Sequence, residues 1–316
     1  MVLQGVGPYK VREPLFEGIR VILSFLHEQY TSEYIQGISG AAFRIGGICP
    51  CAPTCNYAIE PAALIKMLGF ETEHIKTDKE VSMGKNTLKK IKEEIDKGHP
   101  VLVWHAFSNF EWDVVCGYSE KEKLFYGRGS YLGCKEYTSA EECRFLNCDI
   151  CPGVIFIGQK VSSFNAENAE AAALKEAVKH ACSKMNVDKI NKNEWVFLEG
   201  MEAYKRWYMD FKSSEKKRTA GDSYCHSIYK ATHRAAAGFL REIAQKYNKA
   251  EKYIIKSSEH FQKEADILEK ANDLLSWNSP EGPDTENNMK ISEIIKDACN
   301  QYISGIENMA KAICDL

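Results

Sequence analysis

The sequence predicts an α+β fold in its first half and a helical bundle in its second. Up to residue 160, short clusters of valine and aromatic residues alternate with glycine and proline, a pattern typical of antiparallel strands. From residue 165 onward, apolar residues recur every three or four positions, as in amphipathic helices. The 316 residues are 44% hydrophobic and 27% charged, which is enough to bury a core in each half. We therefore expect two domains, residues 1–160 and 165–316.

Three helices and four strands are predicted in the first half. Pro14 and Pro61 can each begin a helix, because proline at the first helical position gives up an N–H that would have no helical partner. The predicted helices are residues 14–26, 61–68 and 88–95, and the predicted strands are residues 101–104, 112–116, 124–126 and 154–157.

Four apolar stripes at helical spacing mark the second half. They run over Leu174–Met185, Ile228–Ile243, Ile254–Leu268 and Ile291–Ile313. Short connections between amphipathic helices favour antiparallel neighbours, so we expect an all-α bundle of about five helices. Four aromatic residues are assigned to its core in preference to a pocket: Trp195, Tyr204, Trp207 and Tyr208.

Composition limits the classes of binding partner that we expect and the cellular compartment of the protein. The net charge is −3 and the lysines are dispersed among acidic residues, so we expect no nucleic-acid partner. No apolar stretch is long enough to span a membrane and no secretory signal begins the chain, so the sequence predicts a cytoplasmic protein. Disulfides are uncommon in a reducing cytoplasm. The cysteines are therefore expected to be metal ligands or free thiols.

Eight of the twelve cysteines fall in the first half, six of them in two tight runs. Closely spaced thiols suit a metal or an iron–sulfur cluster, because neighbouring sulfurs can reach one metal from a single turn. The predicted ligands are Cys49, Cys51 and Cys55 in the first run and Cys143, Cys148 and Cys151 in the second, with Cys116 and Cys134 as further candidates. An iron–sulfur cluster is favoured over zinc. Redox-active thiols or disulfides, and unligated cysteines, remain as alternatives.

The four later cysteines and one histidine pair are assigned to packing. Cys182, Cys225, Cys299 and Cys314 are widely spaced and carry no ligand pattern. His226 and His233 are seven positions apart on one predicted helix and share a face. They have no acidic or thiol partner at matching spacing, so we interpret them as a packed or surface pair.

Three short segments resemble the butirosin biosynthesis protein H-like family and its papain-like relatives. Residues 98–118 are similar to the central hairpin of papain-like cysteine peptidases of the bacteriocin-processing type. Residues 37–44 resemble the N-terminal domain of the butirosin H-like family, and residues 200–207 an element of its helical C-terminal domain. The resemblance implies a papain-like α+β domain followed by a helical domain. It also implies acyl transfer from a carrier-protein thioester to an amine.

The catalytic triad of that fold is missing at all three positions. The place of the cysteine falls at residues 15–18, which contain no thiol; the histidine is replaced by Glu111, and the orienting acid by residues 127–129, Gly-Arg-Gly. Triad catalysis needs a thiolate, a base and an orienting group, so we expect it to be lost. His105 is the nearest substitute base, although a loop histidine without a catalytic role is favoured. Cys116 is either a core thiol or a ligand.

The leading hypothesis is a papain-like-fold protein with a degenerate triad and a cysteine-ligated metal centre. It would serve a redox or metal-dependent step on a small-molecule or peptidic substrate. One alternative is a thiol-dependent acyltransferase or amide hydrolase that uses Cys49 or Cys116 with His105. Another is a non-enzymatic ligand-binding or scaffold protein whose bundle forms a homodimer.

Overall fold

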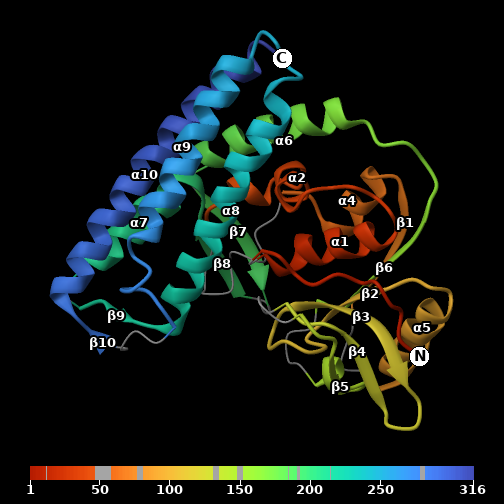
Figure 1. The fold of residues 1–316 in the computed structure, drawn as a ribbon. Helices are drawn as coiled ribbons and strands as arrows, with labels where there is room; N and C mark the ends of the chain where they lie inside the picture. Colours follow the sequence, from red (N-terminus) through yellow and green to blue (C-terminus); the bar gives the residue numbers. More distant parts are fainter. Residues whose placement is uncertain are drawn as a thin grey trace. The chain divides into compact units, whose positions relative to one another are not determined.

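The protein is described here by a computed structural model covering residues 1–11, 13–46, 58–76, 81–130, 135–147, 152–183, 185–190, 193–213, 215–277 and 282–316. It has a mixed α+β architecture with one large antiparallel sheet and many helices (Figure 1). The prediction of an α+β fold is confirmed at this level.

The chain forms two compact units. The first contains residues 1–35 and 59–165, and the second contains residues 36–58 and 166–316. The described residues 36–46 and Ala58 therefore belong to the second unit, although they interrupt the sequence of the first. This interruption contains the segment 37–44 that carries the family resemblance, and the first cysteine run follows it in the sequence.

A six-stranded antiparallel sheet forms the centre of the first unit, in the order β1-β6-β2-β3-β4-β5. Its strands are β1 (Phe70–Ile75), β2 (Val101–Trp104), β3 (Trp112–Ser119), β4 (Leu124–Arg128), β5 (Thr138–Glu141) and β6 (Val154–Lys160). The four predicted strands correspond to β2, β3, β4 and β6. The two unpredicted strands, β1 and β5, lie at the sheet edges and are largely polar, so they lack the apolar cluster that identifies a buried strand.

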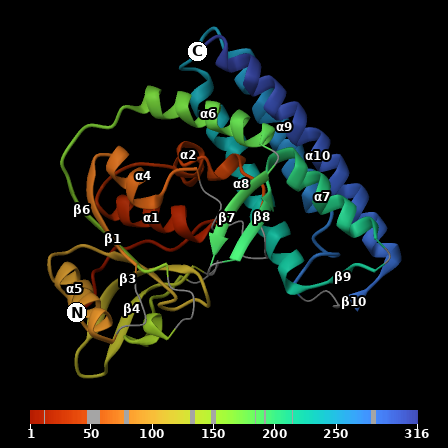
Figure 2. The same cartoon turned by 180° about the vertical axis from the view of Figure 1, so that it is seen from behind.

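Helices cover both faces of this sheet (Figure 2). The described helical segments of the unit are α1 (Pro14–Phe25), the start of α2 (Ser32–Ile38), α4 (Pro61–Met67), α5 (Val81–Asp96) and the short η2 (Arg144–Leu146). On β2, Leu102 lies against Gly18 of α1, whereas Val101 and Val103 join the core cluster that contains Ile91 of α5. Successive strand residues face opposite sides, so α1 and α5 lie on opposite faces.

The second unit consists mainly of helices. Its elements are η1 (Ala41–Phe43), α6 (Ala166–Cys182), β7 (Met185–Ile190), β8 (Asn193–Leu198), α7 (Gly200–Lys212), β9 (Lys217–Arg218), α8 (Ala220–Ala244), α9 (Glu251–Glu269), β10 (Gly282–Pro283) and α10 (Thr285–Ile313). The long helices α8, α9 and α10 run side by side (Figure 1). The predicted helical stripes from residue 228 onward correspond to these three helices.

The expectation of an all-α second domain needs correction. Residues 185–198 contain the antiparallel strands β7 and β8, and Met185, which was assigned to the end of a helical stripe, begins β7. Trp195 lies on β8 and not on a bundle helix. These strands are rich in β-branched and aromatic residues, among them Val187 and Val196, which favour extended backbone over a further helical turn.

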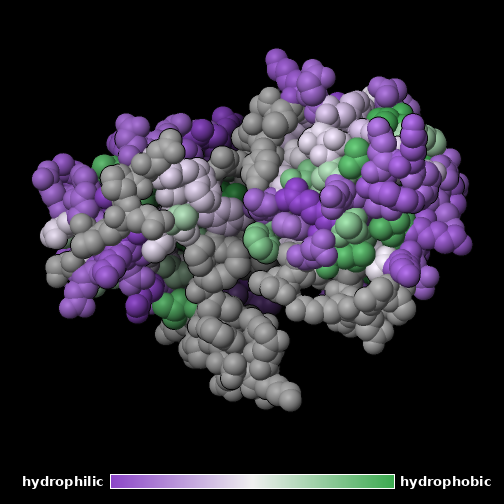
Figure 3. Space-filling model, turned by 90° about the horizontal axis from the view of Figure 1, so that it is seen from below, coloured by the Kyte–Doolittle hydropathy of each residue, from purple (hydrophilic) through white to green (hydrophobic). Residues whose placement is uncertain are grey.

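Hydrophilic side chains cover much of the surface shown in Figure 3, with hydrophobic residues scattered between them. The largest exposed apolar side chains include Phe110, Met209 and Trp277. Within the described part of the chain, none of the helices combines the length and apolar character needed to cross a bilayer.

Candidate functional site

The N-terminus of α1 is the place where the family resemblance predicts a thiolate. Here the helix is capped by Glu13, whose Oε2 accepts hydrogen bonds from the backbone N–H of Phe16 at 2.6 Å and of Glu17 at 3.4 Å. Without this cap, the two amides would be available to bind an anion at the helix terminus. Because the capping carboxyl is buried, the anion-binding capacity of this terminus is already used within the protein.

Tyr9 packs over the first turn of the same helix. Its hydroxyl donates to the carbonyl of Trp112 at 2.9 Å, and a Cβ placed on Gly18 would lie 2.6 Å from that hydroxyl oxygen. Burial raises the pKa of Tyr9, and the nearby carboxyls of Asp113 and Glu17 raise it further. The tyrosine is therefore a neutral group that fills the space beside the helix terminus.

Two carboxyls at this site differ in their hydrogen-bond partners. Burial raises the pKa of Glu13 to about 7, despite the two backbone hydrogen bonds that favour its ionised form. Glu17 is instead paired with Arg20, whose Nε and Nη2 donate to it at 2.8 and 2.7 Å. Ser32 at the start of α2 also donates to Glu17. This buried pair fixes α1 to α2 and serves packing.

The other two positions at which the family resemblance expects triad residues hold Glu111 and residues 127–129, Gly-Arg-Gly. Glu111 immediately precedes β3, and its backbone carbonyl accepts from the N–H of His105 at 2.8 Å. Gly127 of β4 lies where a Cβ would come within 2.0 Å of the Val114 carbonyl oxygen. An orienting acid therefore cannot stand at that position without moving the strand.

His105 lies in a strained loop between β2 and β3. His105 and Phe110 adopt positive φ angles of 59° and 55°, which non-glycine residues rarely do. The Nδ1 of His105 accepts the Phe110 N–H at 3.0 Å, so the neutral ring carries its proton on Nε2. Partial burial and the charge of Arg144 lower the pKa of His105.

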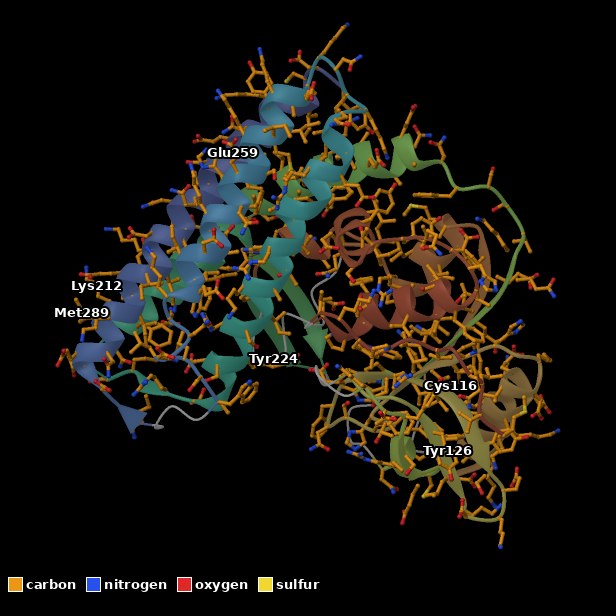
Figure 4. All side chains as sticks on the ribbon, in the orientation of Figure 1. Cys116, Tyr126, Lys212, Tyr224, Glu259 and Met289 are labelled. Carbon is orange, nitrogen blue, oxygen red and sulfur yellow. The ribbon has the colours of Figure 1, made fainter. Side chains whose placement is uncertain are left out.

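Cys116 is a core thiol. It lies on β3 (Figure 4), is fully buried, and its pKa is raised to about 12 by burial. Because the thiolate is the nucleophilic form, this burial disfavours nucleophilic attack by the free thiol.

Most of the predicted metal ligands lie outside the described residues: Cys49, Cys51, Cys55, Cys134, Cys148 and Cys151. Of the second run, Cys143 is described. It is exposed at the start of η2, with its sulfur 3.9 Å from Oε2 of Glu141. No group of three or more potential ligands is assembled for a metal within the part of the chain that the structure covers.

Residues Phe43–Gly46, which end two residues short of the first run at Cys49, are called the stem here. Four buried side chains from the three helices α6, α8 and α10 hold its backbone, one for each stem residue. The contacts join Tyr302 Oη to the Phe43 carbonyl (3.1 Å), His233 Nε2 to the Arg44 carbonyl (3.3 Å), His180 Nε2 to the Ile45 carbonyl (2.9 Å) and Tyr229 Oη to the Gly46 carbonyl. The stem is therefore held along its whole length by the helical unit.

The side chain of Arg44 adds charged contacts to this arrangement. Its guanidinium nitrogens lie 3.1 Å from Glu176 of α6 and 3.3 Å from Glu199, which precedes α7. The N–H of Gly200 also donates to the Ile45 carbonyl at 2.8 Å. The stem thus connects the end of α6 with the start of α7.

The backbone that follows the second run, at Pro152 and Gly153, is held by contacts to β1. His74 of β1 contacts Oε1 of Glu60 through Nδ1 at 3.0 Å and the Pro152 carbonyl through Nε2 at 2.7 Å. Gly153 has a φ of +108°, and a Cβ there would lie 1.9 Å from the Ile75 carbonyl oxygen. The residues that follow Cys151 are therefore held tightly against β1.

Sequence reasoning identified the cysteine runs but missed the side chains that hold the chain beside them. His233 was assigned to packing, and it is fully buried. Its role at Arg44 joins positions that lie far apart in the chain, and no local pattern encodes that pairing. The chain matches no protein-family model, and no curated protein matches its sequence.

Proposed function

We propose that this protein has a papain-like unit without triad catalysis and binds a metal through its cysteine runs. An iron–sulfur cluster is favoured over zinc. The metal would serve a redox or metal-dependent step on a small-molecule or peptidic substrate. The observation that carries the proposal is the stem, whose last residue, Gly46, is held by Tyr229 just before Cys49 in the sequence.

A held stem favours metal binding because it reduces the conformational entropy that a ligand loop loses on binding. The chain on the far side of the run is also fixed, since Ala58 packs against Gly40, where an added Cβ would lie 2.6 Å from the Ala58 Cβ. Pro50 and Pro53 reduce the number of backbone conformations that the first run can adopt in the unfolded chain. Three thiols joined to two fixed ends are a suitable ligand set.

The type of metal determines the chemistry available. A cluster held by three thiolates keeps one iron open for a substrate atom, by analogy with the open position of catalytic zinc sites. Zinc held by four thiolates has no open position and is structural. Metal binding would release the thiol protons to solvent, and the protein's own contribution would be to hold the chain on both sides of the thiols in place.

The α1 terminus argues against thiol catalysis at the papain-type position. Its amides are capped by Glu13 and its side is filled by Tyr9. Cys116, the described thiol proposed for acyl transfer, is buried with a raised pKa. The same filled terminus favours the second candidate function, a ligand-binding or scaffold protein without catalysis.

The test is iron, zinc and sulfide analysis of protein purified without oxygen, together with its visible absorption spectrum. We expect bound metal in the native chain and its loss in Cys51→Ser. Cys314→Ser serves as the control, because Cys314 is an exposed thiol beyond the end of α10. A native protein free of iron, zinc and sulfide would overturn the proposal and favour the scaffold function.

A further inference from the structure

We propose that the helical unit contains a peptide-recognition site, which the chain's own stem occupies. The ligand class is an extended peptide with an aromatic residue, an arginine, an aliphatic residue and a glycine in succession, as in residues 43–46. This recognition needs no metal, since it consists of contacts among side chains and backbone groups that the structure describes.

The stem lies in this site as an extended strand. Arg44 has φ −87° and ψ 142°, and Gly46 forms an antiparallel bridge with Glu199, which follows β8. The N–H of Gly200 donates to the Ile45 carbonyl at 2.8 Å. Main-chain pairing of this kind supplies affinity when a protein binds an extended peptide, and side-chain pockets supply specificity.

The side chains that bind the stem backbone are oriented by other contacts within the helical unit. Nδ1 of His233 is bonded to Oε1 of Glu264, and the ring of Tyr302 stacks on the imidazole with centroids 5.6 Å apart. A carbonyl oxygen can only accept, so the contact of Nε2 to the Arg44 carbonyl requires a proton on Nε2. Because the helices themselves orient this donor, less entropy is lost when a peptide binds.

Phe43 is the apolar anchor of the bound segment. It is fully buried, and its ring lies edge-on to those of Phe239 and Phe261, with centroids 5.9 and 5.5 Å apart. Phe239 also lies against Gly37, where an added Cβ would come within 2.1 Å of the Phe239 Cγ. The site therefore selects an aromatic residue at position 43 and a glycine six residues before it.

Two carboxyl groups select arginine at the next position. The guanidinium nitrogens of Arg44 lie 3.1 Å from Glu176 and 3.3 Å from Glu199. His180 is neutral, because burial and the charge of Arg44 lower its pKa to about 3. The imidazole therefore adds no positive charge that would repel the guanidinium, and its Nε2 lies 2.9 Å from the Ile45 carbonyl oxygen.

The stem reaches this site from a distant part of the chain. Residues 36–46 interrupt the sequence of the first unit, whereas the helices that bind them follow from residue 166 onward. The bound segment is short and continuous, so a separate peptide of the same sequence can make the same contacts. In the native chain, the covalent connection gives the stem a high effective concentration and keeps it bound.

Cleavage of the folded chain after residue 165, at the boundary of the two units, tests this site. A protease recognition sequence is inserted there, and the cut protein is analysed by size-exclusion chromatography. We expect the native fragments to elute together, because the stem stays bound. Arg44→Glu should separate them, since it places a carboxylate beside Glu176 and Glu199.

Arg206→Glu is the matched control. Arg206 is exposed and pairs with Asp210 on its own helix, so the fragments of this variant should stay together. Native fragments that separate after cleavage would overturn the proposal. Fragments of Arg44→Glu that elute together, as in the control, would also overturn it.

Displacement by a peptide tests the site without a substitution in the protein. Excess synthetic peptide of residues 36–46 should separate the cleaved native fragments, because it carries both Gly37 and Phe43. The same peptide with Phe43→Ala should need a concentration at least about 10-fold higher, as expected for the loss of a buried aromatic anchor. Equal potency of the two peptides, or no displacement by either, would contradict the proposal.

Discussion

His233 and Glu264 form a fully buried pair in the helical unit, with Nδ1 of the imidazole bonded to Oε1 of the carboxyl. Each is 0% exposed. Oε2 of the same carboxyl makes no hydrogen bond within the described structure. The pair joins α8 to α9 and directs the other ring nitrogen toward the Arg44 carbonyl.

Removing one member of this pair is expected to destabilise the protein strongly. Glu264→Ala leaves the imidazole and the Tyr204 hydroxyl without their shared acceptor in a buried site, which costs about 3–5 kcal/mol. Glu259→Ala on the same helix is the control, because Glu259 is exposed (Figure 4). Urea denaturation measures the difference. Equal unfolding free energies for the two variants would contradict a role for the pair in stability.

Glu13 gives the first unit a pH-dependent stability. Its pKa is raised from 4.5 to about 7 in the folded protein, so between these values the folded state binds more protons than the unfolded state. Stability therefore falls as the pH rises from 4.5 to 7, by up to about 3 kcal/mol. Glu13→Gln should remove this slope while keeping an oxygen for the cap.

The measurement is urea denaturation at several pH values in that window. Glu136→Gln, at an exposed position, is the control and should keep the native slope. A native-like slope in Glu13→Gln would show that folding does not raise the pKa of Glu13.

Native-state alkylation should distinguish the two described thiols of the first unit. Cys143 is exposed, whereas Cys116 is buried with a pKa of about 12. We expect iodoacetamide to modify Cys143 in the folded protein and Cys116 only after denaturation, because the thiolate is the nucleophile. His105→Ala should leave both rates unchanged. Rapid labelling of Cys116 that depends on His105 would restore the acyltransferase hypothesis.

Substitution by alanine at Gly153, which follows the second run, can be compared with the same substitution at Gly98, which precedes β2. Both have positive φ angles, +108° and +89°, but an added Cβ meets the Ile75 carbonyl oxygen at 1.9 Å in the first case and nothing within 4 Å in the second. Gly98→Ala should cost about 1 kcal/mol for its backbone conformation. Gly153→Ala should cost more, because strand β1 or the chain after Cys151 must shift. Thermal unfolding compares them, and equal losses would mean that the contact relaxes freely.

Local sequence patterns were sufficient to predict the helices and strands whose buried residues recur at a regular spacing. Helices α1 and α4 begin at the prolines that predicted them, and strands β2 and β3 coincide with the valine-rich clusters. The polar edge strands were not predictable in this way, since an edge strand derives its pairing from its neighbour and not from its own apolar residues. The hairpin β7–β8 interrupted a region where helical spacing continued only as far as Cys182.

Some features of the candidate site can likewise be predicted from the sequence, and others cannot. The cysteine spacings and the absence of triad residues at positions 15–18 and 111 are properties of the sequence alone, because they depend on which residues are adjacent in the chain. The capping of α1 by Glu13 is also local, since it spans three residues.

Only the tertiary structure could assign the stem to the helical unit. Arg44 and His233 are 189 positions apart, and their contact forms where α6, α8 and α10 pack around a segment from the other half of the sequence. Sequence periodicity reports which face of an element is buried but not against which partner. The residues that hold the stem are therefore identified by the fold, whereas the cysteines that follow it are identified by the sequence.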